Sequence, residues 1–362
     1  ISFKEVLAKG KKSIFCPVAL KASDTAFLQY TGGTTGVSKG AVLSHGNLTA
    51  NFQQLDPVLR LALKEQEERT ILPLPLYHIL GLCSLFAMAK LGAKCSLITN
   101  PRDIPTLIKT LQKIKPTCLI GINTLFEKLL AHKKFKKLKL PSLKLTMAGG
   151  MKTEKKVKNQ WESLTGSKLI EGYGLTECSP GVSTDMIHGI HHIPLPGTFV
   201  IIADETGKEV PYGTAGELLI KGPQISQSYW QNPIETAGAF VNGWFKTGDI
   251  ATMDANGFVS IVDRKKDMIN ISGFNVYPNE IEQILIGYPK VLEVGAIGVT
   301  DMVQKEAIKV FIVKKDATLT ADEVIAYCKA KMTPYKVPKY VEFCNSLPKS
   351  PIGKVLRRLL KK

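Results

Sequence analysis

The sequence predicts an α/β protein with a parallel sheet and helices in a large domain, a β-rich subdomain, and a small α+β C-terminal domain. Three observations predict this. Strand-like and helix-like stretches alternate from Lys94 to Gly174, short strands dominate after about Pro180, and a mixed pattern begins near Asp263. Regular β-α-β-α alternation is typical of parallel strands with helices on both faces. We expect a large domain over residues 1–263 and a mobile small domain over 264–362.

Length and composition indicate a globular protein. The chain has 362 residues, 44% hydrophobic and 22% charged, which is enough for more than one domain. There is no apolar run long enough to span a bilayer and no signal peptide, so we expect a cytoplasmic protein. The seven cysteines never form a C-x-x-C pair, which favours a reducing compartment. Because the chain opens on Ile1, we expect it to begin inside a longer protein.

The first notable stretch is a loop over residues 30–40. It holds four glycines, three threonines, a serine and Lys39, between a short buried strand at 26–30 and an apolar run at 41–43. Glycines let the backbone approach a ligand, while hydroxyls, backbone N–H groups and a lysine suit an anion. The Walker A spacing is absent. The loop predicts phosphate binding, with a flexible linker as the less favoured alternative. Ser44 can cap a helix that begins near His45.

The alternating region follows. Asp103 can cap a helix whose apolar residues 104, 107, 108, 111 and 114 share one face. The other expected elements are strands at 94–99, 117–122, 144–148 and 168–171 and helices at 123–132 and 155–164. Because ligands of such sheets bind beyond the carboxyl ends of the strands, the loops at Gly149-Gly150 and at 172–177 are candidate site loops.

The remaining elements are shorter. A hairpin turn at 204–207 and a strand at 216–222 belong to the β-rich subdomain. The charged run 263–267 predicts a hinge. Beyond it we expect strands at 269–271, 294–299 and 308–314 and helices at 278–286 and 321–331. Pro278 suits the first turn of its helix.

Several polar residues could carry chemistry, although a surface turn is an even alternative for Thr176 and Glu177, and a turn or a solvated charge is the favoured interpretation of Asp249 and Arg264 taken singly. Thr176 and Glu177 could hold a phosphate oxygen and its Mg²⁺. Asp249 could bind both hydroxyls of a ribose, and Arg264 could add a contact to the sugar. Lys354 lies on a turn whose shape is set by two prolines and a glycine. We therefore expect its side chain to have a fixed direction and a specific contact. We do not expect a metal site at His188, His191 and His192, because the loop offers no companion ligand pair.

The net charge of +17 is concentrated between Lys133 and Lys158, where ten lysines face the single acid Glu154. A solvated face is the default interpretation. The more specific interpretation is a peripheral attraction to anionic lipid at the cytoplasmic face of a membrane. Nucleic acid is not expected as a partner, because no aromatic or groove-reading element accompanies the charge.

The order of these motifs resembles that of the acyl-adenylate-forming enzymes, and the match is most similar to bacterial long-chain fatty acid–CoA ligases. The resemblance covers nearly the whole chain. It is carried by Tyr30–Gly40, Pro73–His78, Thr99–Asp103, Gly172–Cys178, Thr247–Asp249, Asp263–Glu280 and Pro348–Lys354. The resemblance implies that a fatty acid attacks MgATP to give acyl-AMP and that coenzyme A then takes the acyl group.

The resemblance also implies residue roles. The β- and γ-phosphates would be held by Tyr30, Thr31, Gly32, Gly33, Thr34, Thr35, Gly36, Ser38 and Lys39, and the α-phosphate by Thr176. Adenine and ribose would contact Gly149, Gly150, Tyr173, Asp249 and Arg264, while Glu177 would bind Mg²⁺. Lys354 and His78 would be catalytic, Lys266 the hinge, and Ser272, Gly273 and Phe274 the coenzyme A path.

Alternatives stay open. The chain could be a ligase for another carboxylic acid, such as an aryl or medium-chain acid, or a non-catalytic nucleotide-binding fragment. The family's large domain begins upstream of Ile1, so we expect residues 1–362 alone to bind ATP poorly and turn over slowly. The segment at His191-His192 departs from the family's glycine, which puts that loop in doubt. A second copy of the chain, in a homodimer, is a further partner to be tested.

Overall fold

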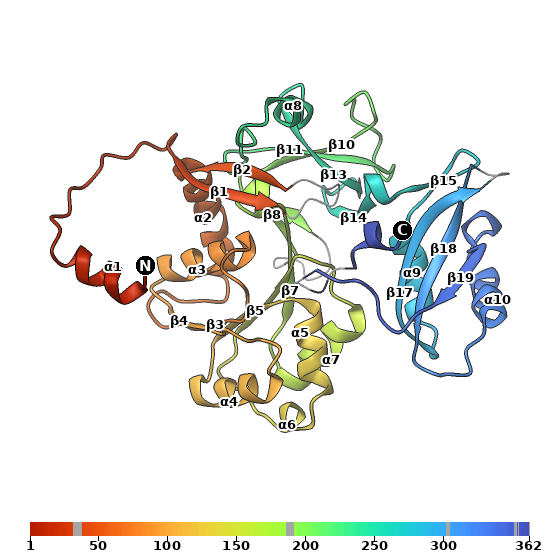
Figure 1. Cartoon of the computed structure of the whole chain (residues 1–362), viewed down its shortest axis with the longest axis horizontal. Helices are drawn as coiled ribbons and strands as arrows, with labels where there is room; N and C mark the ends of the chain where they lie inside the picture. The colour runs from red at the N-terminus through yellow and green to blue at the C-terminus, as the bar shows by residue number, and fades with distance from the viewer. Residues whose placement is uncertain (32–37, 186–191, 302–304, 351–352, 354, 362) are drawn as a thin grey trace.

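The computed structural model describes residues 1–31, 38–185, 192–301, 305–350, 353 and 355–361. Figure 1 shows a central sheet, a β-rich sheet above it, and a C-terminal sheet to one side. The termini lie far apart, with the N-terminal helix α1 (Phe3–Gly10) on an arm at the opposite end from the C-terminal sheet. The alternating, β-rich and mixed regions of the sequence therefore each correspond to one of these sheets.

The central sheet has seven strands in the order β4-β3-β5-β6-β7-β8-β9. The strands from β4 to β7 run parallel, and β8 and β9 add antiparallel pairs. The expected parallel sheet is thus confirmed; the sequence analysis had not identified β3 or helix α3. The bounds are β3 Arg69–Leu72, β4 Lys94–Leu97, β5 Cys118–Gly121, β6 Leu145–Gly149, β7 Leu169–Gly174, β8 Gly181–Thr184 and β9 Ile193–Pro194.

Helices cover both faces of this sheet. Because successive strand residues point to opposite faces, Ile71 packs with helices α4, α5 and α7, whereas Leu72 packs with α2 and α3. Trp161, on helix α7, is fully buried and contacts Phe126 and Phe135, with ring centroids 4.8 and 5.4 Å away. The helix bounds are α2 His45–Leu59, α3 Ile79–Lys90, α4 Ile104–Ile114, α5 Asn123–Ala131, α6 Lys133–Lys136 and α7 Lys155–Thr165.

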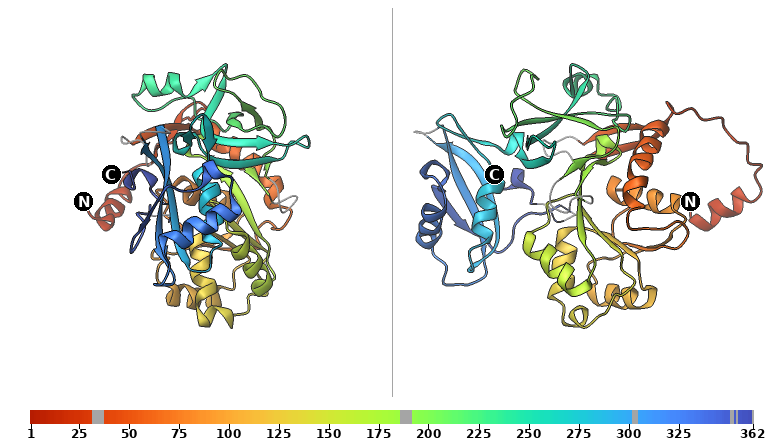
Figure 2. Two further views of the ribbon diagram at one scale, coloured as in Figure 1. Left: turned by 90° about the vertical axis from the view of Figure 1, so that its right-hand side faces the viewer. Right: turned by 180° about the vertical axis from the view of Figure 1, so that it is seen from behind.

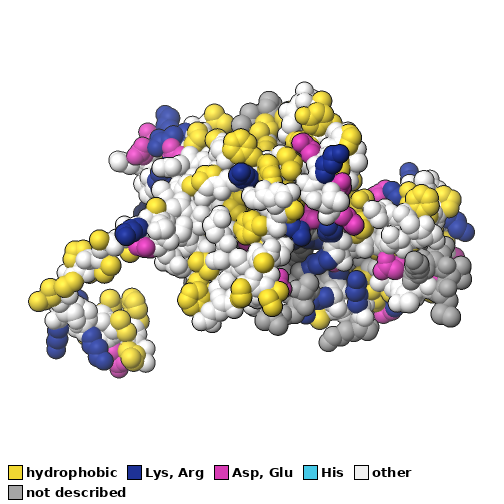
Figure 3. Space-filling model, turned by 90° about the horizontal axis from the view of Figure 1, so that it is seen from above, with side chains coloured by type: hydrophobic (Ala, Val, Ile, Leu, Met, Phe, Trp, Pro, Cys, Tyr) yellow, Lys and Arg dark blue, Asp and Glu magenta, His cyan; other side chains and the backbone are white. Residues whose placement is uncertain are grey.

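Strands β1 (Thr25–Thr31) and β2 (Lys39–Ser44) form a separate antiparallel pair. The expectation of a buried strand here was wrong, because Leu28 and Tyr30 are 38% and 57% exposed. Only one face of the pair is covered, where Leu43 packs into a small core with α2 and α3. Figure 2 shows the arm that leads from β1 back to α1, and Figure 3 shows hydrophobic side chains along it. The hydrophobic residues Ile14 and Phe15, between α1 and β1, are 91% and 86% exposed.

The β-rich sheet follows the order β10-β11-β13-β12, with β14 paired to β13. Its register shifts by one residue between Ile250 and Ala251, so that Asp249 lies opposite Arg264 while Ala251 lies opposite Ile261. Such a bulge changes which face each following side chain meets. The bounds are β10 Phe199–Ala203, β11 Gly216–Lys221, β12 Phe240–Val241, β13 Trp244–Met253, β14 Val259–Arg264 and helix α8 Pro233–Gly238.

The C-terminal sheet has the order β16-β15-β18-β17, with β19 parallel to β18. Helices α9 (Pro278–Ile286) and α10 (Ala321–Lys331) match the expected residues at both ends. The reason is local: Pro278 opens α9, and a capping box between Thr320 and Glu323 opens α10. The strands are β15 Ile269–Ile271, β16 Phe274–Val276, β17 Val291–Asp301, β18 Lys305–Lys314 and β19 Tyr340–Phe343. In the described part of the chain, none of the helices combines the length and hydropathy of a membrane span.

Candidate active site

The carboxyl edge of the central sheet is lined with glycine. Gly149 ends β6 and pairs with Gly172 near the end of β7, and Gly150 has a φ of +79° that favours glycine. The side chain of Leu80, from the start of α3, fits against Gly149, where an added Cβ would meet it at 3.1 Å. Leu80 therefore covers the edge at Gly149, whereas an added Cβ at Gly172 would meet nothing closer than the Ala148 carbonyl oxygen at 4.0 Å, so the backbone there can be approached closely.

Tyr173, Asp249 and Arg264 converge beside this edge. The Tyr173 hydroxyl donates to Oδ2 of Asp249 at 2.6 Å, and Nε of Arg264 lies 2.7 Å from Oδ1. Asp249 is only 3% exposed. Burial raises the pKa of the Tyr173 hydroxyl well above its ordinary value, and the Asp249 carboxylate adds to the rise, so the phenol remains a donor. The sequence analysis named all three residues, and the structure brings them into contact.

Thr176 and Glu177 lie in the 3₁₀ turn η1 (Thr176–Cys178), directly after β7. The turn packs against both β1 and β2, so it adjoins the strands that flank the glycine-rich loop. A backbone hydrogen bond also holds the turn to the loop that carries Ser226, because the Ser226 N–H donates to the Glu177 carbonyl oxygen at 2.7 Å. A hydroxyl and a carboxylate therefore lie beside the two ends of the expected phosphate loop.

Two side-chain contacts at or near this turn had no signal in the sequence. The hydroxyl of Tyr229 donates to Oε1 of Glu177 at 2.7 Å. Burial raises the pKa of Tyr229, and the Glu177 carboxylate raises it further. Nearby, Nζ of Lys39 lies 2.5 Å from Oε2 of Glu235 and 5.6 Å from the centre of the Tyr229 ring. Tyr229 and Glu235 come from a loop and helix α8 that no spacing rule connects to Glu177 or Lys39.

The expected phosphate loop is described only at its ends. Thr31 and Lys39 are paired across β1 and β2, as are Tyr30 and Gly40, and the Ser38 hydroxyl donates to the Thr31 carbonyl. The remaining expected residues, Gly32, Gly33, Thr34, Thr35 and Gly36, lie outside the described residues. The described ends show that the loop joins two antiparallel strands.

His78 is the N-cap of helix α3. Its Nδ1 accepts from the Leu80 N–H at 3.2 Å, so the ring is neutral at that nitrogen when the cap is formed. Burial lowers the pKa of His78 below its ordinary value. The preceding residue is tied to β1, because Gln29 Nε2 donates to the Tyr77 carbonyl at 2.7 Å. His78 thus lies between the phosphate-loop strands and the glycine-lined edge.

Lys354 lies outside the described residues, but the turn around it reaches the same part of the molecule. Gly353 abuts helix α5 at Thr124, and an added Cβ would lie 2.9 Å from Cγ2 and Oγ1 of that residue. An isolated bridge between Lys349 and Val355 closes the base of the turn. Helix α5 begins just after the carboxyl end of β5, so the turn lies at the candidate site edge.

The expected hinge and coenzyme A residues lie in the C-terminal part. Lys266 is in the 3₁₀ turn η2 (Lys265–Asp267), between β14 and β15. Ser272 and Gly273 form the turn between β15 and β16 with φ of +50° and +94°. Phe274 is 57% exposed and stacks on Tyr335, with ring centroids 4.8 Å apart.

The residues present can accommodate a magnesium ion at Glu177. Its Oε1 is held by Tyr229, and none of the described residues donates to Oε2. Mg²⁺ is usually bound by one or two carboxylates together with substrate phosphates. The described part of the chain holds no group of three or more His, Cys, Asp or Glu side chains suited to a metal. Glu177 could therefore hold the ion only together with oxygens of a bound ligand.

The histidine cluster is only partly described: His188 and His191 lie outside the described residues. Nε2 of His192 lies 3.8 Å from a Glu171 carboxylate oxygen, and its Nδ1 is 3.4 Å from the Ser183 hydroxyl. These are polar contacts of one side chain at the edge of the central sheet.

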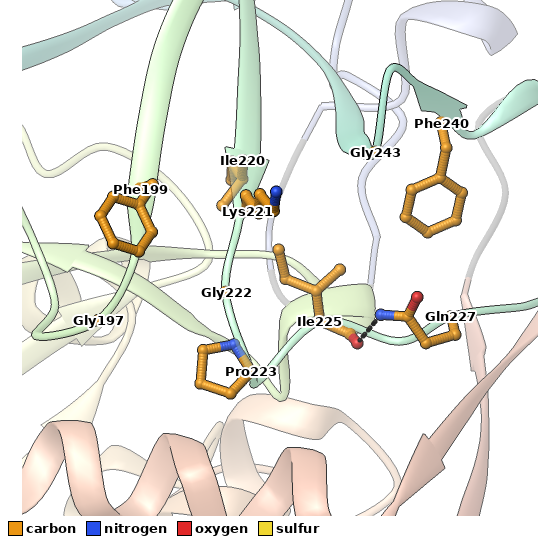
Figure 4. A pocket seen from close by; sticks show the side chains of 10 residues that line it. All are labelled: Gly197, Phe199, Ile220, Lys221, Gly222, Pro223, Ile225, Gln227, Phe240 and Gly243. Atoms are coloured by element: carbon orange, nitrogen blue, oxygen red, sulfur yellow. Dashed lines mark hydrogen bonds between the residues drawn. The ribbon is translucent and has the colours of Figure 1, made fainter.

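A cavity of about 320 Å³ lies in the β-rich sheet. Figure 4 shows Phe199, Ile220 and Ile225 around it, with Gln227 Nε2 donating to the Ile225 carbonyl. Part of its lining, namely Gly222, Pro223, Ile225 and Gln227, comes from the loop that also carries Ser226 and Tyr229. No residue of the expected nucleotide site lines it.

The chain matches two family models. Residues 3–230 match the AMP-binding enzyme model, and residues 280–354 match the model of the AMP-binding enzyme C-terminal domain. The chain is 49% identical over its whole length to a long-chain-fatty-acid–CoA ligase of Yersinia pestis, and spans 65% of that relative's length.

Solved structures agree with this match. The ATP-bound MatB of Rhodopseudomonas palustris aligns with a TM-score of 0.88 at 31% identity, covering 96% of this chain and 70% of MatB. The o-succinylbenzoate coenzyme A synthetase of Bacillus subtilis in complex with ATP and magnesium aligns with a TM-score of 0.85 at 28% identity, covering 96% and 72%. The expected adenylate-forming fold is confirmed, and this chain belongs to the AMP-binding enzyme family.

Proposed function

We propose that this chain is the ATP- and acyl-activating part of a long-chain fatty acid–CoA ligase. The observation that carries the proposal is the meeting of Tyr173, Asp249 and Arg264 at the same sheet edge as Thr176 and Glu177. A ribose beside Asp249 would place its phosphates towards η1 and the β1–β2 loop. The identity to the Yersinia pestis ligase supports a fatty acid as the substrate.

The first step joins the fatty acid to AMP. A carboxylate oxygen of the acid attacks the α-phosphorus of ATP, and the bond from that phosphorus to pyrophosphate breaks. Residues 30–36, Ser38 and Lys39 would hold the β- and γ-phosphates, and Thr176 the α-phosphate. Lys354 would neutralise charge that builds between the carboxylate and the α-phosphate. His78 would lie by the acyl carboxylate.

The second step forms the thioester. The sulfur of coenzyme A attacks the acyl carbon, the thiol proton is lost, and AMP leaves with the electron pair of the broken acyl–oxygen bond. We propose that residues 264–362 rotate about Lys266 between the steps. That rotation would withdraw Lys354 and bring Ser272, Gly273 and Phe274 to the path of the thiol.

Magnesium, held by Glu177 and the phosphates, would neutralise phosphate charge and polarise the reacting phosphoryl group. The orientation of Glu177 by Tyr229 supports this assignment. The Bacillus subtilis synthetase with ATP and magnesium supports the same metal for this fold.

A ligase for another carboxylic acid is the second candidate. The favouring observation is that the chain shares its fold, at 28% identity, with a synthetase that acts on o-succinylbenzoate, an aryl acid. Competition among long-chain, medium-chain and aryl acids in pyrophosphate exchange separates the two candidates.

The decisive experiment measures AMP released by the purified full-length protein. We expect release that requires ATP, Mg²⁺, a long-chain fatty acid and coenzyme A together. ATP binding without acid-dependent AMP release would favour the non-catalytic alternative. Residues 1–362 alone, which span 65% of the Yersinia pestis ligase, are expected to release AMP slowly or not at all.

We also propose peripheral contact with anionic membranes through the lysine-rich face. Lys133, Lys134, Lys136 and Lys137 are exposed on and after α6, and Lys155 and Lys156 are exposed at the start of α7. Attraction of this kind is screened by salt. Binding to vesicles with anionic lipid that does not weaken with rising salt would contradict the proposal. The homodimer stays a prediction, for which the mass of the protein in solution is the test.

A further inference from the structure

A network of buried charges surrounds Arg357, three residues beyond Lys354. Arg357 lies in the 3₁₀ turn η4 (Arg357–Leu359), and its side chain is 11% exposed. Its guanidinium contacts Glu282 twice, with Nε–Oε1 and Nη2–Oε2 distances of 3.0 and 2.7 Å. Nη2 also donates to Asn279 Oδ1 at 2.5 Å. This bidentate pair ties the end of the chain to helix α9.

The same guanidinium reaches across the expected hinge. Nη1 of Arg357 lies 3.1 Å from Oδ1 of Asp263 and 3.2 Å from Oδ2 of Asp267. Asp263 is in β14, before Lys266, and Asp267 follows it. Asp263 is 2% exposed, and its Oδ2 also accepts from the Asn279 N–H at 2.7 Å. Thus Asp263 receives two donors from beyond the hinge.

The two sets of contacts respond differently to a rotation about the hinge. The pairs of Arg357 with Glu282 and Asn279 lie wholly on the C-terminal side, so a rigid rotation of residues 264–362 preserves them. The contacts of Asp263 with Arg357 and Asn279 join the two sides, so the same rotation breaks them. They exist only in an orientation like the one seen here, in which Gly353 abuts Thr124.

We propose that Asp263 and Arg357 form a latch that favours the orientation in which the Lys354 turn faces the nucleotide site. Arg357 is then a positioning residue for acyl-AMP formation, and this inference rests on the proposed two-step function. Buried ion pairs are costly to break singly, because the remaining charge loses its partner. A contact present in one orientation only shifts the population towards it.

The test separates the two half-reactions in the full-length protein. Asp263→Asn weakens the contact across the hinge and leaves Arg357 paired with Glu282. We expect acid-dependent ATP–pyrophosphate exchange to fall about tenfold, within the usual range of conformational coupling. Thioester formation from supplied long-chain acyl-AMP and coenzyme A should be unchanged or faster.

Matched variants define the controls. Arg358 is the exposed neighbour of Arg357, so Arg358→Gln should leave both half-reactions at wild-type rates. Asp254→Asn removes an exposed carboxylate from the turn between β13 and β14 and should behave likewise. Equal loss of both half-reactions in Asp263→Asn, or no change in exchange, would overturn the latch.

A second readout does not depend on activity. Amide hydrogen exchange of residues 345–361 should be faster in Asp263→Asn than in Arg358→Gln, because the turn is released from β14. Equal protection in the two variants would refute the latch, even in a protein that makes acyl-AMP. If the wild type makes no acyl-AMP, the proposed function fails, and this measurement alone decides whether the latch exists.

Discussion

Tyr229 holds the carboxylate of Glu177 through a hydrogen bond of 2.7 Å between its hydroxyl and Oε1. The bond joins a loop of the β-rich region to the turn after β7, 52 residues apart in sequence. Because burial keeps the Tyr229 pKa high, the donor persists through the physiological pH range. Glu177 is therefore oriented before any ligand binds, with its second oxygen left for one.

Tyr229→Phe should raise the Mg²⁺ concentration needed for half-maximal pyrophosphate exchange about tenfold or more. A hydrogen bond to a charged group contributes about 1.5–3 kcal/mol, and about 1.4 kcal/mol corresponds to tenfold. The measurement is a magnesium titration at saturating ATP and fatty acid. Tyr212→Phe, at a tyrosine that is 64% exposed, should leave the titration unchanged. An unaltered Mg²⁺ requirement in Tyr229→Phe would mean that Tyr229 does not orient the metal ligand.

Lys354→Ala, in the full-length protein, should block acyl-AMP formation but spare thioester formation from supplied acyl-AMP. Loss of one charge-stabilising donor costs about 100-fold or more in rate. Both half-reactions are measured on the same preparation, with the exposed Lys361→Ala as control. If Lys354→Ala slowed both half-reactions alike, its assignment to the first step would be rejected.

Protonation of His78 should lower the stability of the folded protein in mild acid. Because burial lowers its folded-state pKa, the unfolded chain takes up the proton first as pH falls below the ordinary value of 6.5. Stability is thus unaffected above that value and declines as pH falls towards the lower, folded-state pKa. His78→Asn keeps a capping side chain that does not titrate, so its melting temperature should fall less between pH 7 and 5.

The control is Asn232→Ser, which replaces the side chain that caps α8 with another that does not titrate, so the acid-induced decline should match that of the wild type. Parallel declines for the wild type and His78→Asn would show that His78 is not the group responsible.

Gly174→Ala should disrupt the turn that carries Thr176 and Glu177. A Cβ at this position would lie 2.1 Å from the Pro180 carbonyl oxygen, and neither backbone can move without shifting η1. Overpacking of this kind costs about 1–3 kcal/mol of unfolding free energy. Chemical denaturation measures it, with Gly238→Ala as a control where an added Cβ meets nothing within 4 Å. A Gly174→Ala protein as stable as Gly238→Ala would contradict this account of the turn.

Local chemistry explains what the sequence could predict. Proline and a capping box set the starts of α9 and α10, and Tyr173 and Thr176 lie near the end of β7 and just after it, where ligands of a parallel sheet are expected. A sheet with parallel strands brings such ends together whatever the details of packing. Asp249 and Arg264 lie on the antiparallel β-rich sheet, so their meeting with Tyr173 was predicted from the family resemblance alone.

Contacts between distant, locally unremarkable residues could not be predicted. Tyr229 and Glu177 are 52 residues apart, and Arg357 and Asp263 are 94 apart. No spacing rule connects them, because tertiary packing alone brings them together. The exposure of Leu28 and Tyr30 was missed for a related reason: an apolar pattern predicts a strand but cannot show whether anything covers its second face.

The one-residue bulge in β14 has a consequence for both sites. Arg264 faces Asp249 at the nucleotide edge, while its immediate neighbour Asp263 turns to Arg357 on the far side. Deleting or inserting a single residue between 259 and 262 would reverse this parity and exchange their partners. The proposed ribose contact, Arg264, and the proposed latch residue, Asp263, are thus adjacent in β14, so shifting this strand to change one contact would also change the other.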